Sequence, residues 1–315
     1  MTVQIIYPAD RGAWLAARNL DITASTASAL LGVSPWVSAY QLWAEKTGRL
    51  SEQSVTDAMQ RGLDFEEVVV KRLRRERPDW EIEYRADNTY FRDPNARIGA
   101  TPDTFATRPD RYGQGTVQLK TKSSHSFRRE WIDHDTGEVI VPVDTAIQTI
   151  IEAHLTGSVW AAVAVLVVDP YDFHVLDVPL HARIYQRIKA KVAEFWALVD
   201  SGKEPDPDWS RDGAAVLDVY RESQPERRDL TGDPDINATV ERYLDAKATA
   251  TAATRILDDL RPRIVRALGT AEVGETSRWE ISARTTTRTG PLGQAVQSRT
   301  LRIKPRQETP HAERF

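Results

Sequence analysis

Asp103, Gln118 and Lys120 carry side chains that together suit the hydrolysis of a phosphodiester bond. In QLKTK, the alternation of a β-strand puts Gln118 and Lys120 on one face and turns Leu119 into the core. If Asp103 ends the neighbouring strand, its carboxylate meets them at one place. Mg²⁺ prefers hard oxygen ligands, here Asp103, a backbone carbonyl near Leu119 and the phosphate itself. Lys120 would hold or deprotonate the attacking water and offset the charge that develops on the phosphate.

A site of this kind needs one more carboxylate, and the segment GLDFEE offers it. Glu66 or Glu67 follows Phe65 near the edge of the buried face of a predicted helix, so one of them would point toward the strand ends. The ordinary alternatives are a solvated helix residue for either glutamate and a simple turn at Asp103.

The elements that must position these residues follow from capping, periodicity and alternation. The segment from Asp21 to Leu31 has the pattern of a short helix, whose start Thr23 or Ser25 would cap and which Gly32 would end. The resulting fold class is α/β (α+β), with a mixed central sheet flanked by helices. The other predicted elements are helices over 34–48 and 57–77, a strand pair over 80–93, a hairpin formed by 97–107 and 115–123, a helix over 144–157, a central apolar strand over 159–168 and a helix over about 180–202.

The composition changes after the last of these helices. Pro-, Gly- and Asp-rich stretches predict a linker over residues 206–234, which separates a domain of residues 1–205 from an accessory helix, basic β-hairpin and tail over residues 235–315. Pro262 is expected to kink or interrupt the accessory helix, and residues 307–315 are expected to be a frayed tail. The arm would mediate oligomerisation, dock a partner or hold DNA, in the last case through the basic residues Arg299, Arg302 and Lys304.

Composition excludes several other chemistries. The chain of 315 residues has no cysteine, which removes disulfides, thiol nucleophiles, thiolate zinc sites and iron–sulfur clusters. It shows no Gly-rich phosphate loop, nucleophile elbow or HExxH pair. The net charge of −4 does not indicate a polyanion partner. Basic clusters nevertheless occur, and one of them lies beside His125 and His134. The sequence contains no membrane span, so a soluble protein of the bacterial host cytoplasm is expected.

Six segments follow one another within about residues 11–170: RNLDITASTASALLG, SAYQLW, GLDFE, GATPD, QLKTK and AIQTIIEAHLTG. Each motif is weak by itself, but their order resembles the YqaJ-type viral recombinase nucleases, relatives of lambda exonuclease within the PD-(D/E)XK superfamily. The resemblance implies that residues 1–205 form a PD-(D/E)XK exonuclease-like domain. It also implies that Glu66, Asp103 and Gln118 supply metal ligands, beside the Leu119 carbonyl, and that Lys120 assists the water.

By the same resemblance, Arg18 and Ser25 correspond to a pocket for the 5′ phosphate of a DNA end. A hydroxyl and N–H groups at a helix start, next to a guanidinium, bind an anion well. The alternative is a helix cap with an unrelated surface arginine. Of the family's paired glutamines, only Gln148 is carried over to this pocket, because the second position is Ile150.

The sequence departs from the family at Gln118, where the family usually has glutamate. Glutamine keeps a carbonyl oxygen for a metal ion but lacks the negative charge, so divalent metal binding should be weaker. Glu152 shares a helix face with Gln148 and would restore part of that charge, although a solvated helix face is the more ordinary explanation.

Three functional hypotheses remain open. The leading one is a Mg²⁺-dependent exonuclease of phage or prophage type, with Mn²⁺ as a substitute, that resects double-stranded DNA from a 5′ end. The direction, a single-strand annealing partner and a trimeric ring as homo-oligomer are implied by the resemblance alone. The alternatives are a DNA-end binding or assembly module whose nuclease centre is impaired by Gln118, and a site-specific endonuclease on the same scaffold.

Overall fold

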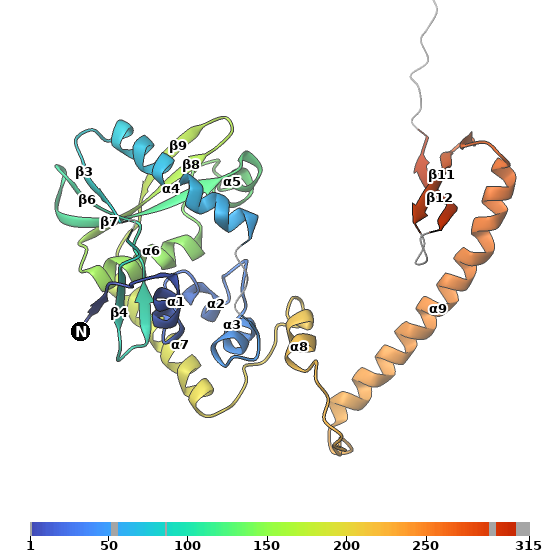
Figure 1. Cartoon of the computed structure of the whole chain (residues 1–315), viewed down its shortest axis with the longest axis horizontal. Helices are drawn as coiled ribbons and strands as arrows, with labels where there is room; N and C mark the ends of the chain where they lie inside the picture. Colours follow the sequence, from blue (N-terminus) through green and yellow to red (C-terminus); the bar gives the residue numbers. More distant parts are fainter. Residues whose placement is uncertain (1, 52–55, 86, 290–293, 307–315) are drawn as a thin grey trace, which may run out of the picture. The chain divides into compact units, whose positions relative to one another are not determined.

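The computed structural model describes residues 2–51, 56–85, 87–289 and 294–306, and of Ala58 the backbone alone. The chain divides into two compact units, Met1–Gln224 and Pro225–Phe315 (Figure 1). No helix of the described residues is long and apolar enough to cross a membrane. The tail predicted for residues 307–315 lies outside the described residues.

The first unit is built around a mixed five-stranded sheet in the order β3-β6-β7-β8-β9. β7 and β8 run parallel, and the other neighbours are antiparallel. Every residue of β8 is buried, as the apolar run predicts for a central strand that is covered on both faces. The predicted mixed central sheet is therefore confirmed. Its strands are β3 (Glu81–Tyr84), β6 (Thr104–Arg108), β7 (Arg111–Lys122), β8 (Trp160–Val167) and β9 (Asp172–Asp177).

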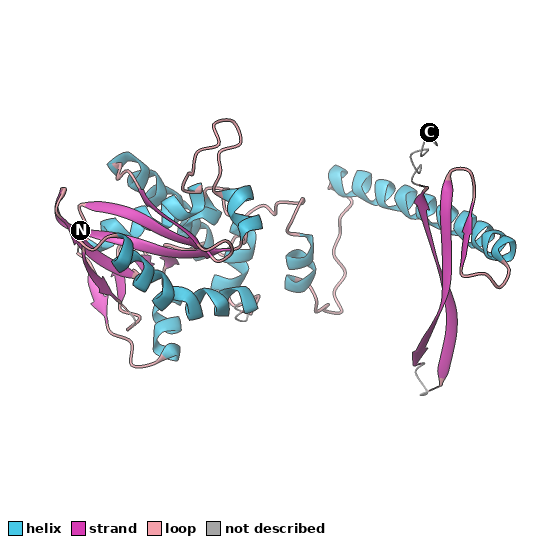
Figure 2. Cartoon of the chain, turned by 90° about the horizontal axis from the view of Figure 1, so that it is seen from above, coloured by secondary structure: helices cyan, strands magenta, loops and turns pink. Residues whose placement is uncertain are grey.

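Helices cover both faces of this sheet (Figure 2). α4 (Asp57–Glu76) packs through Val69 and Leu73 on the face that holds Leu119, which is 5% exposed. α6 (Val143–Thr156) packs through Ile147, Ile150 and Ile151 on the opposite face. Because successive strand residues alternate, Leu119 points toward α4, and its two neighbours point toward α6.

A second, four-stranded sheet has the order β1-β4-β5-β2. Here the predicted strand pair over 80–93 is wrong, because β3 pairs with β6 in the large sheet whereas β4 pairs with β1 and β5. Residues 97–107 are likewise not one strand: β5 and β6 belong to different sheets, and Pro102 between them has no N–H with which to continue a ladder. The strands are β1 (Gln4–Ile6), β2 (Ile22–Thr23), β4 (Tyr90–Asp93) and β5 (Ile98–Ala100).

The helix predicted over residues 21–31 is reduced to the single turn α2 (Ala27–Leu30), whose N-cap residue Thr26 makes no side-chain capping bond. The preceding residues instead form β2 and a turn, in which Thr26 Oγ1 lies 2.9 Å from Thr23 Oγ1. Hydroxyls that bond to one another and to local carbonyls compete with helix formation. The remaining helices of this unit are α1 (Arg11–Asn19), α3 (Ala39–Lys46), α5 (Ser124–Glu130), α7 (Ala182–Asp200) and α8 (Gly213–Val219); α8 falls within the predicted linker.

The second unit consists of the long helix α9 (Pro234–Leu268) and a three-stranded antiparallel sheet, which confirms the predicted arm and hairpin. The strands are β10 (Val273–Glu275), β11 (Trp279–Thr289) and β12 (Ala295–Pro305). No residue of α9 is buried among those described. The helix continues past Pro262 for a further six residues, so the predicted interruption is wrong. Ile264 and Val265 beyond the proline are half-buried, and this packing holds the last turns in helical form.

Candidate active site

Asp103 lies in the loop between β5 and β6, where its carboxylate contacts β7. Its Oδ2 accepts a hydrogen bond from Gln118 Nε2 at 2.5 Å and another from the Leu119 backbone N–H at 2.9 Å. The Asp103 carbonyl in turn accepts the Arg85 backbone N–H at 2.9 Å, which fixes the loop against the end of β3. The structure thus brings Asp103 and the QLK segment together, as the sequence predicts.

Lys120 belongs to a chain of polar contacts that runs into α6. Its Nζ donates to Gln148 Oε1 at 2.9 Å, and Gln148 Nε2 donates to Glu152 Oε1 at 2.9 Å. Glu152 is 1% exposed, and no described residue bonds its Oε2. The explanation of Glu152 as a solvated helix residue is therefore wrong, because the α6 face that carries it packs against the sheet.

Glu66 is the glutamate of α4 that faces the site, whereas Glu67 is exposed. Glu66 Oε2 accepts a hydrogen bond from the hydroxyl of Tyr84 at 3.0 Å, so the last residue of β3 holds its side chain. Sequence reasoning missed Tyr84. The only signal was its place at the end of a strand, two positions after a half-buried isoleucine.

Burial shifts the carboxyl groups of the site toward their neutral forms. It raises the pKa of Asp103 to about 7, with Glu66 adding to the increase and the ammonium of Lys120 opposing it. Burial also raises the pKa of Glu152, and the nearby Asp103 carboxylate raises it further. Burial also raises the pKa of Glu66, whereas the hydrogen bond from Tyr84 and the positive charge of Lys120 lower it. Three carboxyl groups thus compete for one lysine, and a cation among them would favour their ionised forms.

The donor atoms near Asp103 suit a hard divalent cation in kind. Asp103 and Glu66 are carboxylates, and Gln118 Oε1 is a buried oxygen that no described residue bonds. No group of three or more His, Cys, Asp or Glu side chains in the described part of the chain stands ready to hold a metal ion. Gln118 is not one of those residue types. Because glutamine stands here where the family usually has glutamate, the site has one acidic side chain fewer. As arranged, its amide NH₂ faces Asp103, and the amide would have to turn over to offer its oxygen to the same place.

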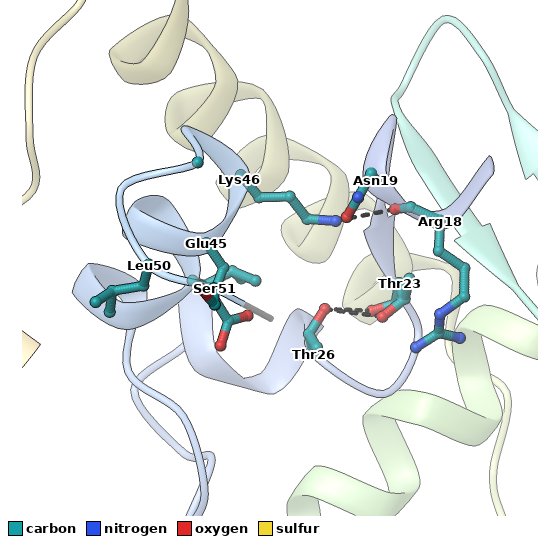
Figure 3. A pocket seen from close by; sticks show the side chains of 10 residues that line it. Arg18, Asn19, Thr23, Thr26, Glu45, Lys46, Leu50 and Ser51 are labelled. Carbon is teal, nitrogen blue, oxygen red and sulfur yellow. Dashed lines mark hydrogen bonds between the residues drawn. The ribbon is translucent and has the colours of Figure 1, made fainter. Parts of the chain in front are cut away.

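Arg18 lines a separate pocket of about 350 Å³, together with the hydroxyl-bearing Thr23 and Thr26 (Figure 3). Ser25 is exposed, and its Oγ lies 3.1 Å from Thr23 Oγ1. The guanidinium of Arg18 stacks over the Trp14 ring at 4.3 Å from its centroid. Guanidinium and hydroxyl groups suit an anion. The helix start expected beside them is a single turn, in which the Thr26 and Ala29 backbone N–H groups already bond the Thr23 and Thr26 carbonyls. The pocket also contains Glu45.

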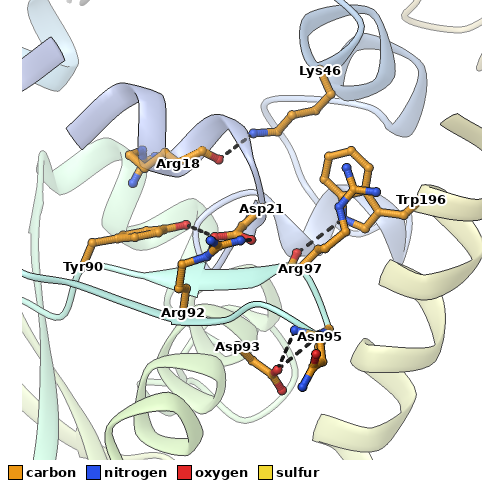
Figure 4. A network of polar contacts seen from close by, with 10 residues as sticks. Arg18, Asp21, Lys46, Tyr90, Arg92, Asp93, Asn95, Arg97 and Trp196 are labelled. Carbon is orange, nitrogen blue, oxygen red and sulfur yellow. Dashed lines mark hydrogen bonds and ion pairs between the residues drawn. The ribbon is translucent and has the colours of Figure 1, made fainter. Parts of the chain in front are cut away.

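A buried ion pair supports the floor of this region (Figure 4). Asp21, which is fully buried, accepts two bonds from Arg92, at 2.9 Å from Nε and 2.8 Å from Nη2, and a third from the Tyr90 hydroxyl at 3.1 Å. This network ties the segment that carries Thr23 to β4. Sequence reasoning missed it, since pairing across 71 residues leaves no local pattern.

His125 and His134 are both exposed, the first on α5 and the second in the loop that follows it. No hydrogen bond or ion pair of the described residues connects them to Asp103 or Lys120.

Comparison with known proteins adds a family match. The family model of the YqaJ-like viral recombinase domain matches residues 13–158. Among solved structures, the alkaline exonuclease LHK-Exo from Laribacter hongkongensis is 20% identical, with a TM-score of 0.48, and covers 65% of this chain and 99% of its own. The same enzyme in complex with dAMP is 18% identical over 65% of this chain and 99% of its own, with a TM-score of 0.47. The comparison with curated proteins gave no match.

The matched range contains every residue described above for the acidic site, from Glu66 to Glu152, as well as Arg18 and Ser25. Residues 13–158, a little under half of the chain, are thus similar to the YqaJ-like viral recombinase domain.

Proposed function

We propose that this protein is a metal-dependent nuclease that degrades double-stranded DNA from a 5′ end. The family match supports a nuclease. The observation that carries the proposal is the junction at β7, where Asp103 bonds the Gln118 side chain and the Leu119 amide while Lys120 extends from the same strand. An acid and a lysine on one strand end, with further carboxyl groups around them, are suited to phosphodiester hydrolysis.

Each side chain has a defined task in this proposal. Asp103, Glu66 and the Leu119 carbonyl would hold Mg²⁺, or Mn²⁺ in its place, and the ion would supply Lewis-acid activation of the phosphate. Lys120 orients the attacking water and offsets negative charge that develops on the phosphate. Gln148 keeps the ammonium group in position, because it bonds Lys120 with its oxygen and Glu152 with its nitrogen.

The substrate specificity rests on the Arg18 pocket. Its guanidinium and threonine hydroxyls, with Ser25 beside them, would receive the 5′ phosphate of a DNA end. Gln148, which bonds Lys120, would contact the DNA beside the reacting phosphate. Resection from that end would leave a single strand for an annealing protein. A ring-shaped homo-oligomer of three chains would keep the enzyme on its duplex, and the mass of the full chain in solution tests this part separately.

The deciding experiment is incubation of three DNA substrates with Mg²⁺ or Mn²⁺: linear duplex with a 5′ phosphate, linear duplex without it, and closed circular duplex. We expect mononucleotide release from the first, slower release from the second and none from the third. Release from neither linear duplex with either ion would overturn the proposal, and cutting of the circle would identify an endonuclease.

Two lysines of β7 provide a matched pair of variants. Lys120→Ala should lower cleavage about 10²–10³-fold, the loss usual for a residue that stabilises transition-state charge. Lys122→Ala, two positions along the same strand face, removes an ion pair with Glu130 at 2.7 Å and should leave cleavage within about threefold. Equal effects of the two changes would mean that Lys120 acts through the strand and not through the reaction.

A second candidate is favoured by the orientation of the Gln118 amide. Its NH₂ group faces Asp103, and an N–H cannot serve as a ligand for a cation. A DNA-end binding module with an impaired centre would bind duplex without Mg²⁺, would lose affinity steeply with salt and would be indifferent to Lys120→Ala.

A further inference from the structure

The β11–β12 hairpin of the second unit has two unlike faces. Its inner face carries Ala283, which is fully buried, opposite the half-buried Leu301. At this base the sheet meets the end of α9, where Leu268 lies so close to Gly274 that a Cβ added there would clash with it at 2.5 Å. The inner face is therefore covered at this base by the unit itself.

Arg299 belongs to that inner face, although it is part of the basic cluster of the hairpin. Its Nε donates to the Ala283 carbonyl at 2.7 Å, its Nη1 to the Gly269 carbonyl at 2.5 Å and its Nη2 to the Ala271 carbonyl. The guanidinium is thus used to fasten the hairpin to the end of α9. The expectation that Arg299 holds DNA is wrong for this reason.

The outer face presents a different set of side chains. By the register of the two strands, Arg284 stands opposite Thr300, and Arg302 stands opposite Ser282. Arg288 lies further along β11 on the same face. All three arginines are exposed, Arg284 by 73% of its side chain. Further hydroxyl groups on this face come from Thr286 and Ser298.

Acidic residues are confined to the base of the outer face. There Glu280 pairs with Lys304 at 3.0 Å, and Glu275 pairs with Arg306 at 3.2 Å. From Ile281 to Ile303, the sequence contains four arginines and no aspartate or glutamate. Of these four, Arg299 is turned inward. Among the described residues, Arg284 forms an ion pair with Glu272 at 3.7 Å, and no ion pair involves Arg288 or Arg302.

We propose that the outer face of the β11–β12 hairpin, through Arg284, Arg288 and Arg302, binds the phosphate backbone of double-stranded DNA. Arginine forks and hydroxyl groups are the usual donors to phosphate oxygens. Arg284 and Arg288 are four strand residues apart, about 13 Å, which equals the rise along the helix axis of about four phosphates of one DNA strand, at 3.4 Å each.

The chemistry of this face favours a nucleic acid over a protein. Energetic centres of protein interfaces combine aromatic side chains with arginine in closely packed pockets, whereas Ser, Thr and Val are under-represented there. The described part of the outer face offers only Val296 and Val273 as large apolar side chains, both near its margins, among Arg, Thr and Ser. A regularly charged backbone is the occupant that such a face matches. The inference rests on the proposed function in one respect, that DNA is the substrate.

The test is binding of the full-length protein to a fluorescent 30-base-pair duplex in EDTA, measured from 50 to 200 mM salt. We compare Arg284→Gln/Arg288→Gln/Arg302→Gln with a matched control, Arg242→Gln/Arg255→Gln/Arg266→Gln, which removes the same charge from exposed positions of α9. Each lost phosphate contact makes the negative slope of log K against log salt concentration shallower by about 0.9. We therefore expect the hairpin variant to lose up to about 2.7 in slope and the α9 variant to lose little.

Two further arms keep the result unambiguous. The triple change to Lys retains the charge and should keep most of the slope, and Arg288→Gln alone, which leaves the base of the hairpin intact, should lose about 0.9. Equal slopes for the hairpin and α9 variants would overturn the inference. A hairpin variant that binds the duplex as before but no longer binds an acidic protein would overturn it too. Because EDTA removes cleavage from this measurement, its failure is independent of the Lys120→Ala test of the nuclease itself.

Discussion

Replacement of Gln118 by glutamate tests the acidic site most directly. Gln118 is 2% exposed and donates from Nε2 to Asp103 Oδ2 at 2.5 Å. In Gln118→Glu, that donor becomes a second carboxylate in contact with the first. Like charges at this separation cannot both be ionised in a buried site, so the pair must keep one proton or acquire a cation.

The loss of folding stability in Gln118→Glu is set by the free energy needed to keep one proton on the carboxylate pair. Two unit charges about 3 Å apart repel by about 5 kcal/mol at an effective dielectric constant of about 20. Holding one proton on a glutamate of ordinary pKa requires about 1.4 kcal/mol per pH unit above about 4.3, hence about 5 kcal/mol at pH 8 and about 2 kcal/mol at pH 6. At about 2–4 °C per kcal/mol, the Tm in EDTA should fall by roughly 10–20 °C at pH 8 and by less than half of that at pH 6.

Intrinsic fluorescence is a suitable readout, because every tryptophan except Trp279 lies in the first unit. The matched control is Gln60→Glu on the surface of α4, where Nε2 donates to Asp64 Oδ1 at 2.8 Å and both residues are exposed. Solvent screens that pair, so its Tm should change by no more than about 2 °C.

Addition of Mg²⁺ or Mn²⁺ should raise the Tm of Gln118→Glu more than that of the unchanged protein, and cleavage should be equal or higher at lower Mg²⁺. If the Tm of Gln118→Glu responds to pH and Mg²⁺ no more than that of Gln60→Glu, the reasoning is refuted. A clear loss of cleavage would mean that the amide is a required part of the site and not a weakened ligand.

Three other predictions concern its surroundings. Because burial raises the pKa of Asp103 to about 7, its contribution to folding is complete below about pH 4 and is lost as the pH rises through 7; unfolding in EDTA between pH 5 and 8 should show this slope, which Asp103→Asn should remove. Tyr84→Phe deletes the bond that lowers the pKa of Glu66, so the acidic limb of the pH–rate profile should move to higher pH; an unchanged limb would exclude Glu66 as its source. Arg92→Gln leaves Asp21 buried with the single bond from Tyr90, which should lower the free energy of unfolding by about 3–5 kcal/mol in urea titrations; a change below about 1 kcal/mol would contradict the role given to this pair.

The sequence was informative where one residue pattern implies one environment. Alternation around Leu119 identified β7 and the face that Gln118 and Lys120 share, and the apolar run of β8 identified a strand covered on both faces. Helical periodicity likewise identified α6, including the residue pair Gln148 and Glu152. What periodicity could not tell was whether Glu152 points to solvent, since that depends on the packing of α6 against β7.

Pairing between distant segments could not be predicted either, because local patterns carry no information on which segments meet in the fold. β3 and β4 both alternate, and nothing local shows that each belongs to a different sheet. The segment around Thr23 contains good capping residues, but its hydroxyls bond one another, and its backbone pairs with β5. Arg299 and Arg302 are indistinguishable as basic residues of one strand, although the pleat turns one inward and the other outward.

The inward turn of Arg299 has a consequence for how the second unit folds and how it can be shortened. The Gly269 and Ala271 carbonyls at the end of α9 are satisfied by a side chain that comes 28 residues or more later in the chain. The last turn of α9 and the hairpin should therefore gain their protection from hydrogen exchange together. A chain that ends after Ala271 would leave those acceptors to water and fray back toward Pro262, so helix and hairpin can be removed as one piece but not one at a time.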